Sequence, residues 1–401
     1  MGLADQRISR RSVLWAAGAA VALTTVAQPT QAAAITPIAS AGPAEPEKRA
    51  ELAERAIVER HVRALWGRSS AQLGTLTWPA ALLDQSFLKW CYWWQAHLLD
   101  CAVDAACRAR TDDRLHRVAA LASGIRTRNI TGWTNRYYDD MAWLALALER
   151  ADRLLGRRYT GPTAELRTAL LAGWNPAVGA VPWRHGDHFY NTPAIGPTGI
   201  ALARLGELPR ARQLADFLRT RLHDPATGLT LDGVREPEDR VDRTVHTYCQ
   251  GVAIGLETEL AVRTGDSAHH DRVTTLVAAT GTHLTNAGVI TGASADDSGL
   301  FMGILARYLA EAALTLGDAT AADIVHTSAR AAWEHRAEVD GLPLFGMDWS
   351  RPVPAPDRPR AFPDFTHAPA ATTSNLSRDL SVQLSGWMLL EMDHRLTAAG
   401  L

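Results

Sequence analysis

The sequence predicts an all-α protein, an (α/α)6 barrel of six inner and six outer helices. Three observations lead to this fold class. Helical hydrophobic patterns follow one another along the chain, and no convincing strand pattern interrupts them. Nearly unbroken apolar helices alternate with amphipathic ones. Long connections rich in Gly, Pro, Asp and Trp precede the apolar helices, whereas short connections follow them.

The expected helices number twelve, and their character alternates. The run Met141 to Leu148 is apolar on every side and indicates a buried helix, whereas 320–337 keeps one polar face. Thr320 and Asp323 form a capping box that would start the latter. The expected helices cover approximately residues 45–66, 85–109, 111–128, 139–156, 162–173, 191–206, 208–222, 245–264, 268–283, 298–316, 320–337 and 377–398.

The six long connections all enter the even-numbered, more apolar helices. In a barrel of alternating inner and outer helices they would gather on one face, at the N-terminal ends of the inner helices. Functional groups concentrate on loops held by a rigid scaffold, so this face is the expected site. A twelve-helix solenoid is the alternative, but the chain shows no clean repeat of fixed period. The connections are 67–84, 129–138, 174–190, 223–244, 284–297 and 338–376.

The N-terminus has the pattern of an export signal. Ser9-Arg10-Arg11-Ser12-Val13-Leu14 is a twin-arginine motif, followed by an apolar run from Trp15 to Ala27 and small residues at Ala32 to Ala34. We therefore expect a signal peptide and flexible lead-in over 1–44, a secreted protein, and one barrel domain, the catalytic one, over 45–401. No second hydrophobic stretch is long enough to anchor the protein, so we expect no membrane span in the mature chain.

The composition limits the class of partner. The formal net charge of -2 over 401 residues gives no reason to expect binding to nucleic acid or to an anionic membrane. Trp is unusually frequent, with 13 residues against 7 each of Tyr and Phe, and many Trp fall in the long connections. Flat aromatic surfaces of this kind suit stacking. We expect a monomer.

Asp139 and Asp140 lie where an aromatic, turn-rich segment becomes the apolar run of the fourth helix. Both carboxylates can face one cavity from the first helical turn. Glycoside hydrolysis needs two carboxyl groups, about 5–5.5 Å apart in retaining enzymes and about 6.5–9.5 Å apart in inverting ones. Sequence neighbours reach the shorter spacing more easily. The alternative is structural, because the helix dipole favours acidic residues in any first turn.

The long connections also supply aromatic and polar groups that a sugar site needs. Each has a structural alternative, because a loop Trp can cover a barrel and an Asp can form a turn or cap a helix. Their collection on one face favours the functional interpretation. The aromatic candidates are Trp78, Trp133, Trp183 and Trp349, with Trp143 one turn into the helix, and the polar ones are Asn135, Arg184, His185, Asp187, Asp232, Asp242, Asp296 and Asp297.

The string Tyr137-Tyr-Asp-Asp-Met-Ala-Trp143 resembles the tandem-aspartate motif of glycoside hydrolase family 76, the endo-α-1,6-mannanases. Four further blocks resemble family segments in the same order, so the resemblance spans about residues 90 to 310. Cys249, where the family usually has Asn, and Met141 after the acid pair depart from the pattern. The blocks are Trp93-Trp-Gln-Ala-His97, Tyr190-Asn-Thr-Pro-Ala-Ile-Gly-Pro197, Leu231-Asp-Gly233 with Asp242 and Thr247-Tyr-Cys-Gln-Gly251, and Gly299-Leu-Phe-Met-Gly-Ile304 with Arg307-Tyr308.

The resemblance implies the (α/α)6 barrel and a retaining hydrolase that cleaves α-1,6-mannosidic linkages in α-mannan, as polysaccharide or oligosaccharide. Asp139 would be the nucleophile and Asp140 the general acid/base, with no cofactor. The loop pair His185 and His188 offers too few ligands for a metal site. The expected substrate-binding residues, from the loops and the resembling blocks together, are Trp94, Trp133, Asn135, Tyr138, Trp143, Trp183, Asn191, Asp232, Asp242, Tyr248, Gln250, Asp297 and Trp349.

Three alternatives remain open. The same cleft could serve a mannan transglycosylase, in which a second sugar replaces water. It could also belong to a non-catalytic mannan-binding protein, although retention of both aspartates argues against this. An epimerase or an unsaturated-uronyl hydrolase on the same barrel should offer His bases or a cluster of basic groups, and the sequence assembles neither.

Overall fold

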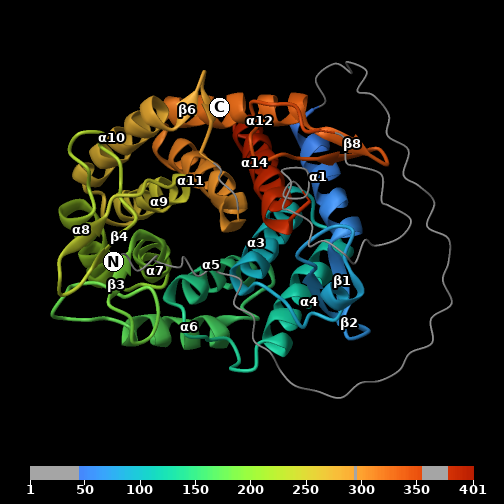
Figure 1. The fold of residues 1–401 in the computed structure, drawn as a ribbon, viewed down its shortest axis with the longest axis horizontal. Helices are drawn as coiled ribbons and strands as arrows, with labels where there is room; N and C mark the ends of the chain where they lie inside the picture. Colours follow the sequence, from blue (N-terminus) through green and yellow to red (C-terminus); the bar gives the residue numbers. More distant parts are fainter. Residues whose placement is uncertain (1–44, 293–295, 355–377) are drawn as a thin grey trace, which may run out of the picture.

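The computed structural model describes residues 45–292, 296–354 and 378–401, and in this part of the chain twelve long helices form two concentric rings (Figure 1). The expected (α/α)6 barrel is therefore confirmed. The inner ring comprises α3 (Tyr92–Arg108), α5 (Tyr138–Leu154), α7 (Thr192–Arg204), α9 (Thr247–Thr264), α11 (Phe301–Leu316) and α14 (Leu380–Ala398). The outer ring comprises α1 (Pro46–Arg60), α4 (Asp112–Arg128), α6 (Thr160–Ala172), α8 (Leu208–Arg221), α10 (Ser267–His283) and α12 (Ala319–His335).

The apolar pattern of each helix explains its ring. In the inner helix α3 every residue from Tyr92 to Ala106 is buried, whereas the outer helix α6 buries only Thr163, Leu166 and Leu170 along one stripe. Neighbouring inner helices also approach closely. A Cβ added at Gly255 of α9 would lie 2.3 Å from the Tyr308 ring of α11, so the missing side chain permits this contact.

Short strands occupy the long connections, so the prediction of a chain without strands is wrong. Backbone N–H and C=O groups need hydrogen-bond partners. In a long ordered connection without a helix, these groups bond to each other across a hairpin. The first expected helix, 45–66, ends at Arg60 for this reason, and α12 starts at Ala319 because Asp318, not Thr320, caps it. The antiparallel pairs are β1 (Val62–Leu65) with β2 (Arg68–Gly74), β3 (Phe189–Asn191) with β4 (Gly233–Arg235) and β5 (Arg240–Asp242), β6 (Thr285–Asn286) with β7 (Val289–Ile290), and β8 (Ala337–Val339) with β9 (Leu342–Leu344).

The connections are joined to one another at the N-terminal ends of the inner helices. The β3–β4–β5 sheet unites the connections that enter α7 and α9. Isolated bridges join Tyr137 to Arg184 and Thr77 to Asp379, so the starts of α5 and α14 each hold a connection from elsewhere in the chain. We call this face the mouth of the barrel. Two short helices, α2 (Leu82–Gln85) and the 3-10 helix η1 (Asp296–Leu300), also belong to it.

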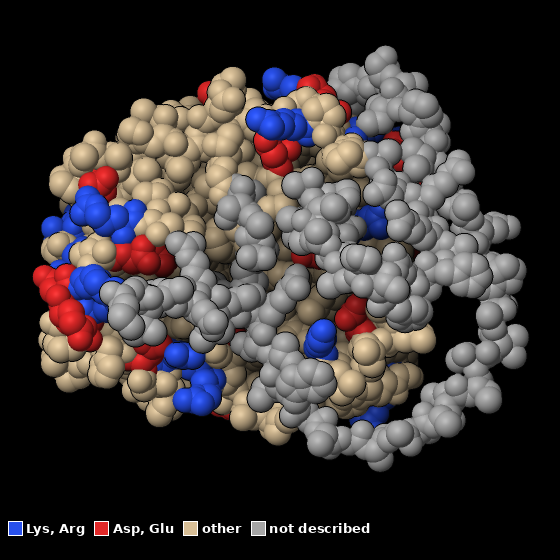
Figure 2. Space-filling model, viewed as in Figure 1, with Lys and Arg blue, Asp and Glu red and all other residues tan. Residues whose placement is uncertain are grey.

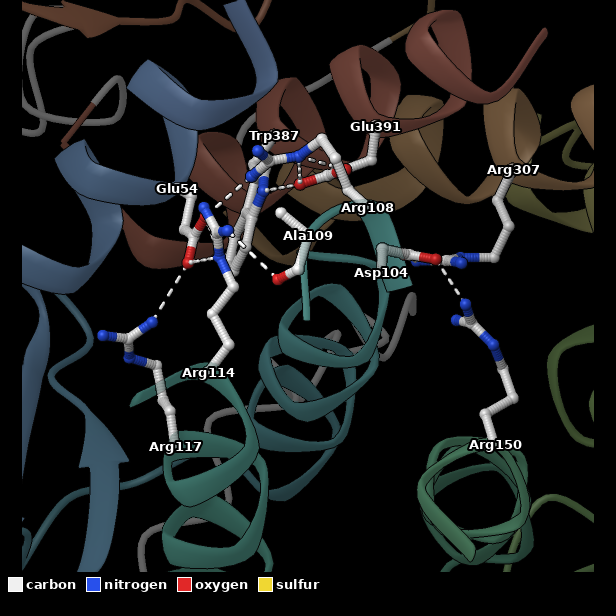
Figure 3. A network of polar contacts seen from close by, with 10 residues as sticks. All are labelled: Glu54, Asp104, Arg108, Ala109, Arg114, Arg117, Arg150, Arg307, Trp387 and Glu391. Carbon is white, nitrogen blue, oxygen red and sulfur yellow. Dashed lines mark hydrogen bonds and ion pairs between the residues drawn. The ribbon is translucent and has the colours of Figure 1, made fainter. Parts of the chain in front are cut away.

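A buried ion-pair network ties the helices together away from the mouth (Figure 3). Arg307 of α11 donates to Asp104 of α3 at 2.6 Å, and Arg150 of α5 pairs with the same carboxylate. Arg108 joins Glu54 of α1 at 2.7 Å to Glu391 of α14 at 3.1 Å, so the first and last helices meet through one guanidinium. Arg114 and Arg117 of α4 also pair with Glu54.

The charge distribution on the surface and the burial of the most apolar helix bear on the kinds of partner expected from the sequence. On the face shown in Figure 2, Lys and Arg side chains alternate with Asp and Glu along the rim, and neither sign forms a continuous patch among the described residues. One described stretch, Ser298–Leu316, is long and apolar enough to cross a membrane, but 78% of it is buried inside the barrel. It contains α11, an inner helix. The expected signal peptide lies outside the described residues.

Candidate active site

The two aspartates occupy the first turn of α5 at the mouth. Asp139 is buried, with 3% of its surface exposed, and Asp140 is partly buried. The backbone N–H of Asp140 donates to Oδ1 of Asp139 at 2.9 Å. The first N–H groups of a helix have no partner within the helix and favour negative charge, so this position stabilises an ionised carboxylate.

Trp183 supplies a second donor to Asp139 from a distant connection. Its indole Nε1–H donates to Oδ2 of Asp139 at 3.1 Å. The loop is fixed in place, because Tyr138 N–H donates to the Trp183 carbonyl at 2.9 Å and His185 N–H donates to the Arg136 carbonyl at 2.8 Å. The sequence separates Trp183 from Asp139 by 44 residues, and the paired backbones bring them together.

Asn135 holds the second aspartate. Its Nδ2–H donates to Oδ2 of Asp140 at 2.7 Å, while its Oδ1 accepts the Tyr137 N–H at 2.8 Å. The second contact fixes which end of the amide faces the carboxylate. Asp139 and Asp140 are thus oriented by two different connections, 174–190 and 129–138.

Aromatic side chains of four inner helices pack against one another near the N-terminal ends of these helices. Tyr248 of α9 and Phe301 of α11 stack with ring centroids 3.7 Å apart and planes 6° apart. The ring of Trp143, one turn after Asp139, lies 4.7 Å from that of His97 on α3. Burial lowers the pKa of His97 to about 3, so this imidazole stays neutral. Trp94 and Trp143 are buried, and their indole N–H groups have no hydrogen-bond partner among the described residues.

Tyr92 lies near Asp140 and was not among the expected site residues, whereas His97, beside Trp143, belongs to the block that resembles the family. Tyr92 donates its hydroxyl to the Trp133 carbonyl at 2.5 Å. Burial raises the pKa of Tyr92 well above its usual value, and the charge of nearby Asp140 raises it further. The block Trp93 to His97 indicates in the sequence that several ring side chains lie together on one inner helix.

Three of the expected substrate-binding residues make structural contacts. Gln250 is buried, accepts the Thr230 N–H at 2.7 Å and donates to the Thr230 carbonyl at 2.8 Å. The exposed Asp242 accepts both the N–H and the hydroxyl of Thr244, at 3.0 and 2.6 Å. Trp349 is buried in the hydrophobic core. These contacts give Gln250 and Asp242 a part in loop structure and Trp349 a part in core packing, and their role in substrate binding stays a prediction.

The other expected residues lie at the mouth in several settings. Trp133 and Asp232 are partly buried, and Asn191, at the start of α7, is buried with no partner for its Oδ1 among the described residues. Tyr138 packs its ring on Gly173, where an added Cβ would lie 2.3 Å away, so it faces the C-terminal end of the outer helix α6. Asp297 belongs to η1, and its side chain lies outside the described residues. No group of three or more His, Cys, Asp or Glu in the described ranges could hold a metal ion.

A family model and solved structures match this chain. The model of glycosyl hydrolase family 76 matches residues 50–378. No curated protein sequence gives a match. The Lin0763 protein from Listeria innocua is similar in structure, with a TM-score of 0.76 and 24% identity over 88% of this chain and 98% of that one.

Two solved mannanases also share the fold. The α-1,6-mannanase GH76A from Salegentibacter sp. HEL1_6 has a TM-score of 0.74 and 24% identity over 88% of this chain and 100% of that one. An inactive variant of that enzyme, with two consecutive aspartates changed to asparagine, was solved in complex with α-1,6-mannotriose. A GH76 α-mannanase from Bacteroides thetaiotaomicron has a TM-score of 0.70 and 13% identity over 88% of this chain and 97% of that one.

Proposed function

The chain belongs to glycosyl hydrolase family 76, and from that premise we propose that it is a retaining hydrolase of α-1,6-mannosidic linkages in α-mannan. The observation that supports this most directly is the pair Asp139 and Asp140, held at the mouth by Trp183 and Asn135. The similar Salegentibacter enzyme is an α-1,6-mannanase that loses activity when two consecutive aspartates are replaced.

The contacts suit two different roles for the pair. Asp139 receives an indole N–H and a backbone N–H, and donors of this kind stabilise a carboxylate in its ionised, nucleophilic form. In the proposed reaction Asp139 attacks the anomeric carbon and displaces the leaving sugar, whose oxygen takes a proton from Asp140. Asp140 then removes a proton from water, which attacks the anomeric carbon and releases Asp139.

The substrate would lie over the mouth. Trp133 and Trp183 are partly buried there and can offer ring faces to a mannosyl unit, and the partly buried Asp232 and the buried Asn191 can offer polar atoms to its hydroxyls. Trp94 and Trp143 lie deeper, with indole N–H groups that have no partner among the described residues.

Two isosteric variants test the proposal. Asp139→Asn and Asp140→Asn should each abolish release of reducing ends from linear α-1,6-mannan, because each removes one of the two required carboxyl groups. Asp216→Asn is the control, since this exposed carboxylate of α8 pairs only on the surface, with Arg219. The anomeric form of the first product, followed by NMR, should be the α-anomer. Full activity in either active-site variant would refute the roles proposed here.

Calorimetry separates the alternatives. Both variants should still bind α-1,6-mannotriose, because the mouth around the carboxylates is unchanged. Mannotriose binding by the unsubstituted protein without any release of reducing ends would favour a non-catalytic mannan-binding protein. Longer mannosides among the products would favour transglycosylation.

We also propose export through the twin-arginine route, supported by the motif at Arg10 and Arg11. Replacing both with Lys should keep the protein inside the producing cell. Cell fractionation with an antibody reads the outcome, and undiminished export of the double-Lys variant would exclude this route.

A further inference from the structure

Large apolar side chains are exposed beside the first hairpin, at the edge of the mouth. The described part of the chain has seven large, exposed apolar residues, and five of them fall here. We call these five the apolar patch: Trp66 (59% exposed), Leu82 (80%), Leu83 (68%), Leu88 (51%) and Ile130 (79%). Monomeric proteins rarely expose apolar residues in such a group, and a group of this kind indicates an interaction surface.

Hydrogen bonds hold the patch together as one platform. The indole N–H of Trp66, at the turn of the β1–β2 hairpin, donates to the Ser86 carbonyl at 3.0 Å. The Ser86 hydroxyl donates in turn to the carbonyl of Leu83 at 2.5 Å. Arg128, two residues before Ile130, donates to the Leu88 carbonyl at 3.0 Å. The hairpin, α2 and the end of α4 therefore present their apolar side chains from a fixed frame.

The fold buries other apolar residues of the same segment. Phe87 and Trp90 lie in the core with 1% and 7% of their surface exposed, so the segment has an inward and an outward apolar side. The outward leucines gain nothing from folding, because they stay in water. Transfer of such surface out of water is favourable, so an apolar partner would be stabilised on it.

The charges around the patch select the kind of partner. Segments 62–90 and 124–136 contain six basic residues and one acidic residue, Asp84, although the whole chain has a net charge of -2. Of these six, Arg68, Lys89, Arg126 and Arg136 are exposed, whereas Arg128 is buried and donates to the Phe87 and Leu88 carbonyls. The overall charge balance conceals this local excess of positive charge. Aliphatic side chains with a Trp and a basic surround are typical of proteins that lie on anionic lipid.

We propose that the apolar patch docks the protein on the surface of an anionic phospholipid bilayer. Leu82, Leu83 and Ile130 would enter the acyl boundary, Trp66 would lie at the headgroup level, and the basic side chains would pair with lipid phosphates. Because the connections 67–84 and 129–138 enter α3 and α5, docking would turn the mouth of the barrel toward the lipid. The proposal does not depend on the activity of Asp139 and Asp140.

Sedimentation with vesicles tests the proposal, with the full chain in every variant so that the N-terminal segment contributes equally. The unsubstituted protein should bind vesicles of equal phosphatidylglycerol and phosphatidylcholine, and bind pure phosphatidylcholine at least fivefold more weakly. Leu82→Ser/Leu83→Ser should weaken binding about tenfold or more, since two side chains leave the acyl boundary. Lys89→Gln should weaken it about fivefold, in line with roughly 1 kcal/mol per basic group near an anionic surface.

Val262→Ser is the matched control, because Val262 is 56% exposed near the C-terminal end of α9, away from the mouth. It should bind vesicles like the unsubstituted protein. Equal melting temperatures and equal hydrolysis of a soluble mannan would show that the patch variants fold. Unchanged vesicle binding in Leu82→Ser/Leu83→Ser would overturn the proposal. So would a patch-dependent dimer, or patch-dependent mannan binding, in a protein that does not bind anionic vesicles.

Discussion

Trp183→Phe tests the proposed role of Asp139 as the nucleophile. The substitution keeps an aromatic ring in the loop but removes the N–H that lies 3.1 Å from Oδ2 of Asp139. A hydrogen bond to a charged group contributes about 1.5–3 kcal/mol. Since about 1.4 kcal/mol is a factor of ten, complete loss of this contribution in the transition state would lower kcat/KM by up to roughly 150-fold. The loss should also favour protonated Asp139, because the lost donor supported the ionised form.

A change in the pH profile distinguishes the loss of this hydrogen bond to Asp139 from a general disturbance of the fold. The acid limb of the pH profile of kcat/KM should move to higher pH, because the lost N–H donor supported the ionised carboxylate of Asp139. Hydrolysis of an α-1,6-mannan oligosaccharide between pH 4 and 8 measures both quantities.

Trp174→Phe is the control for Trp183→Phe. It removes an indole N–H at the start of the same connection, and its ring still lies under Arg210, whose guanidinium carbon is 3.6 Å from the ring centroid. It should change neither kcat/KM nor the acid limb. A folded Trp183→Phe protein with kcat/KM within twofold of normal and an unmoved acid limb would refute the reasoning.

Two further predictions concern stability. Gly124→Ala would place a Cβ 1.9 Å from the Gln72 carbonyl oxygen, so α4 must move away from β2 and the free energy of unfolding in urea should fall by about 1–3 kcal/mol or more. Gly161→Ala, with no atom within 4 Å, should instead raise it by roughly 0.4–1 kcal/mol, and equal effects at the two sites would contradict this explanation. His326 donates from Nδ1 to Oδ1 of Asp393 at 2.6 Å, and this hydrogen bond raises the pKa of His326. A raised folded-state pKa stabilises the fold below the unfolded value of about 6.5, and this stabilisation is lost as pH rises through the folded value, so His326→Gln should lower the melting temperature more at pH 5.5 than at pH 8.5.

The sequence predicted the barrel because the apolar pattern of each helix indicates how far that helix is buried. The run Met141 to Leu148 has no polar side, and α5 is an inner helix. The hairpins could not be predicted in this way. The register of the β1–β2 pair shifts between Ala64 and Leu65, and such pairing depends on a partner strand and on the helix beneath it, not on a local period.

The candidate catalytic pair could be predicted from the sequence for a related reason. Asp139 and Asp140 are adjacent, and their position before an apolar run placed them at the mouth. The hydrogen bonds that Trp183 and Asn135 donate to the pair could not be predicted in this way. The contact from Trp183 depends on the docking of a 17-residue connection, 174–190, and the sequence does not show that the Gln250 amide holds Thr230. Residue type alone does not indicate which polar side chains form hydrogen bonds within the loops and which remain available to a ligand.

The two ends of α5 explain why single hydrogen bonds can orient the carboxylates. Arg150, three turns after Asp139, pairs with Asp100 and Asp104 of α3, and Arg307 of α11 pairs with the same two carboxylates. Breaking a buried ion pair by loss of one partner costs about 3–5 kcal/mol, so α5 cannot turn about its axis without a large penalty. A turn by one residue, about 100°, would carry Asp139 away from the mouth. The buried network therefore fixes the backbone of the pair, and the loops need only select the direction of each carboxylate.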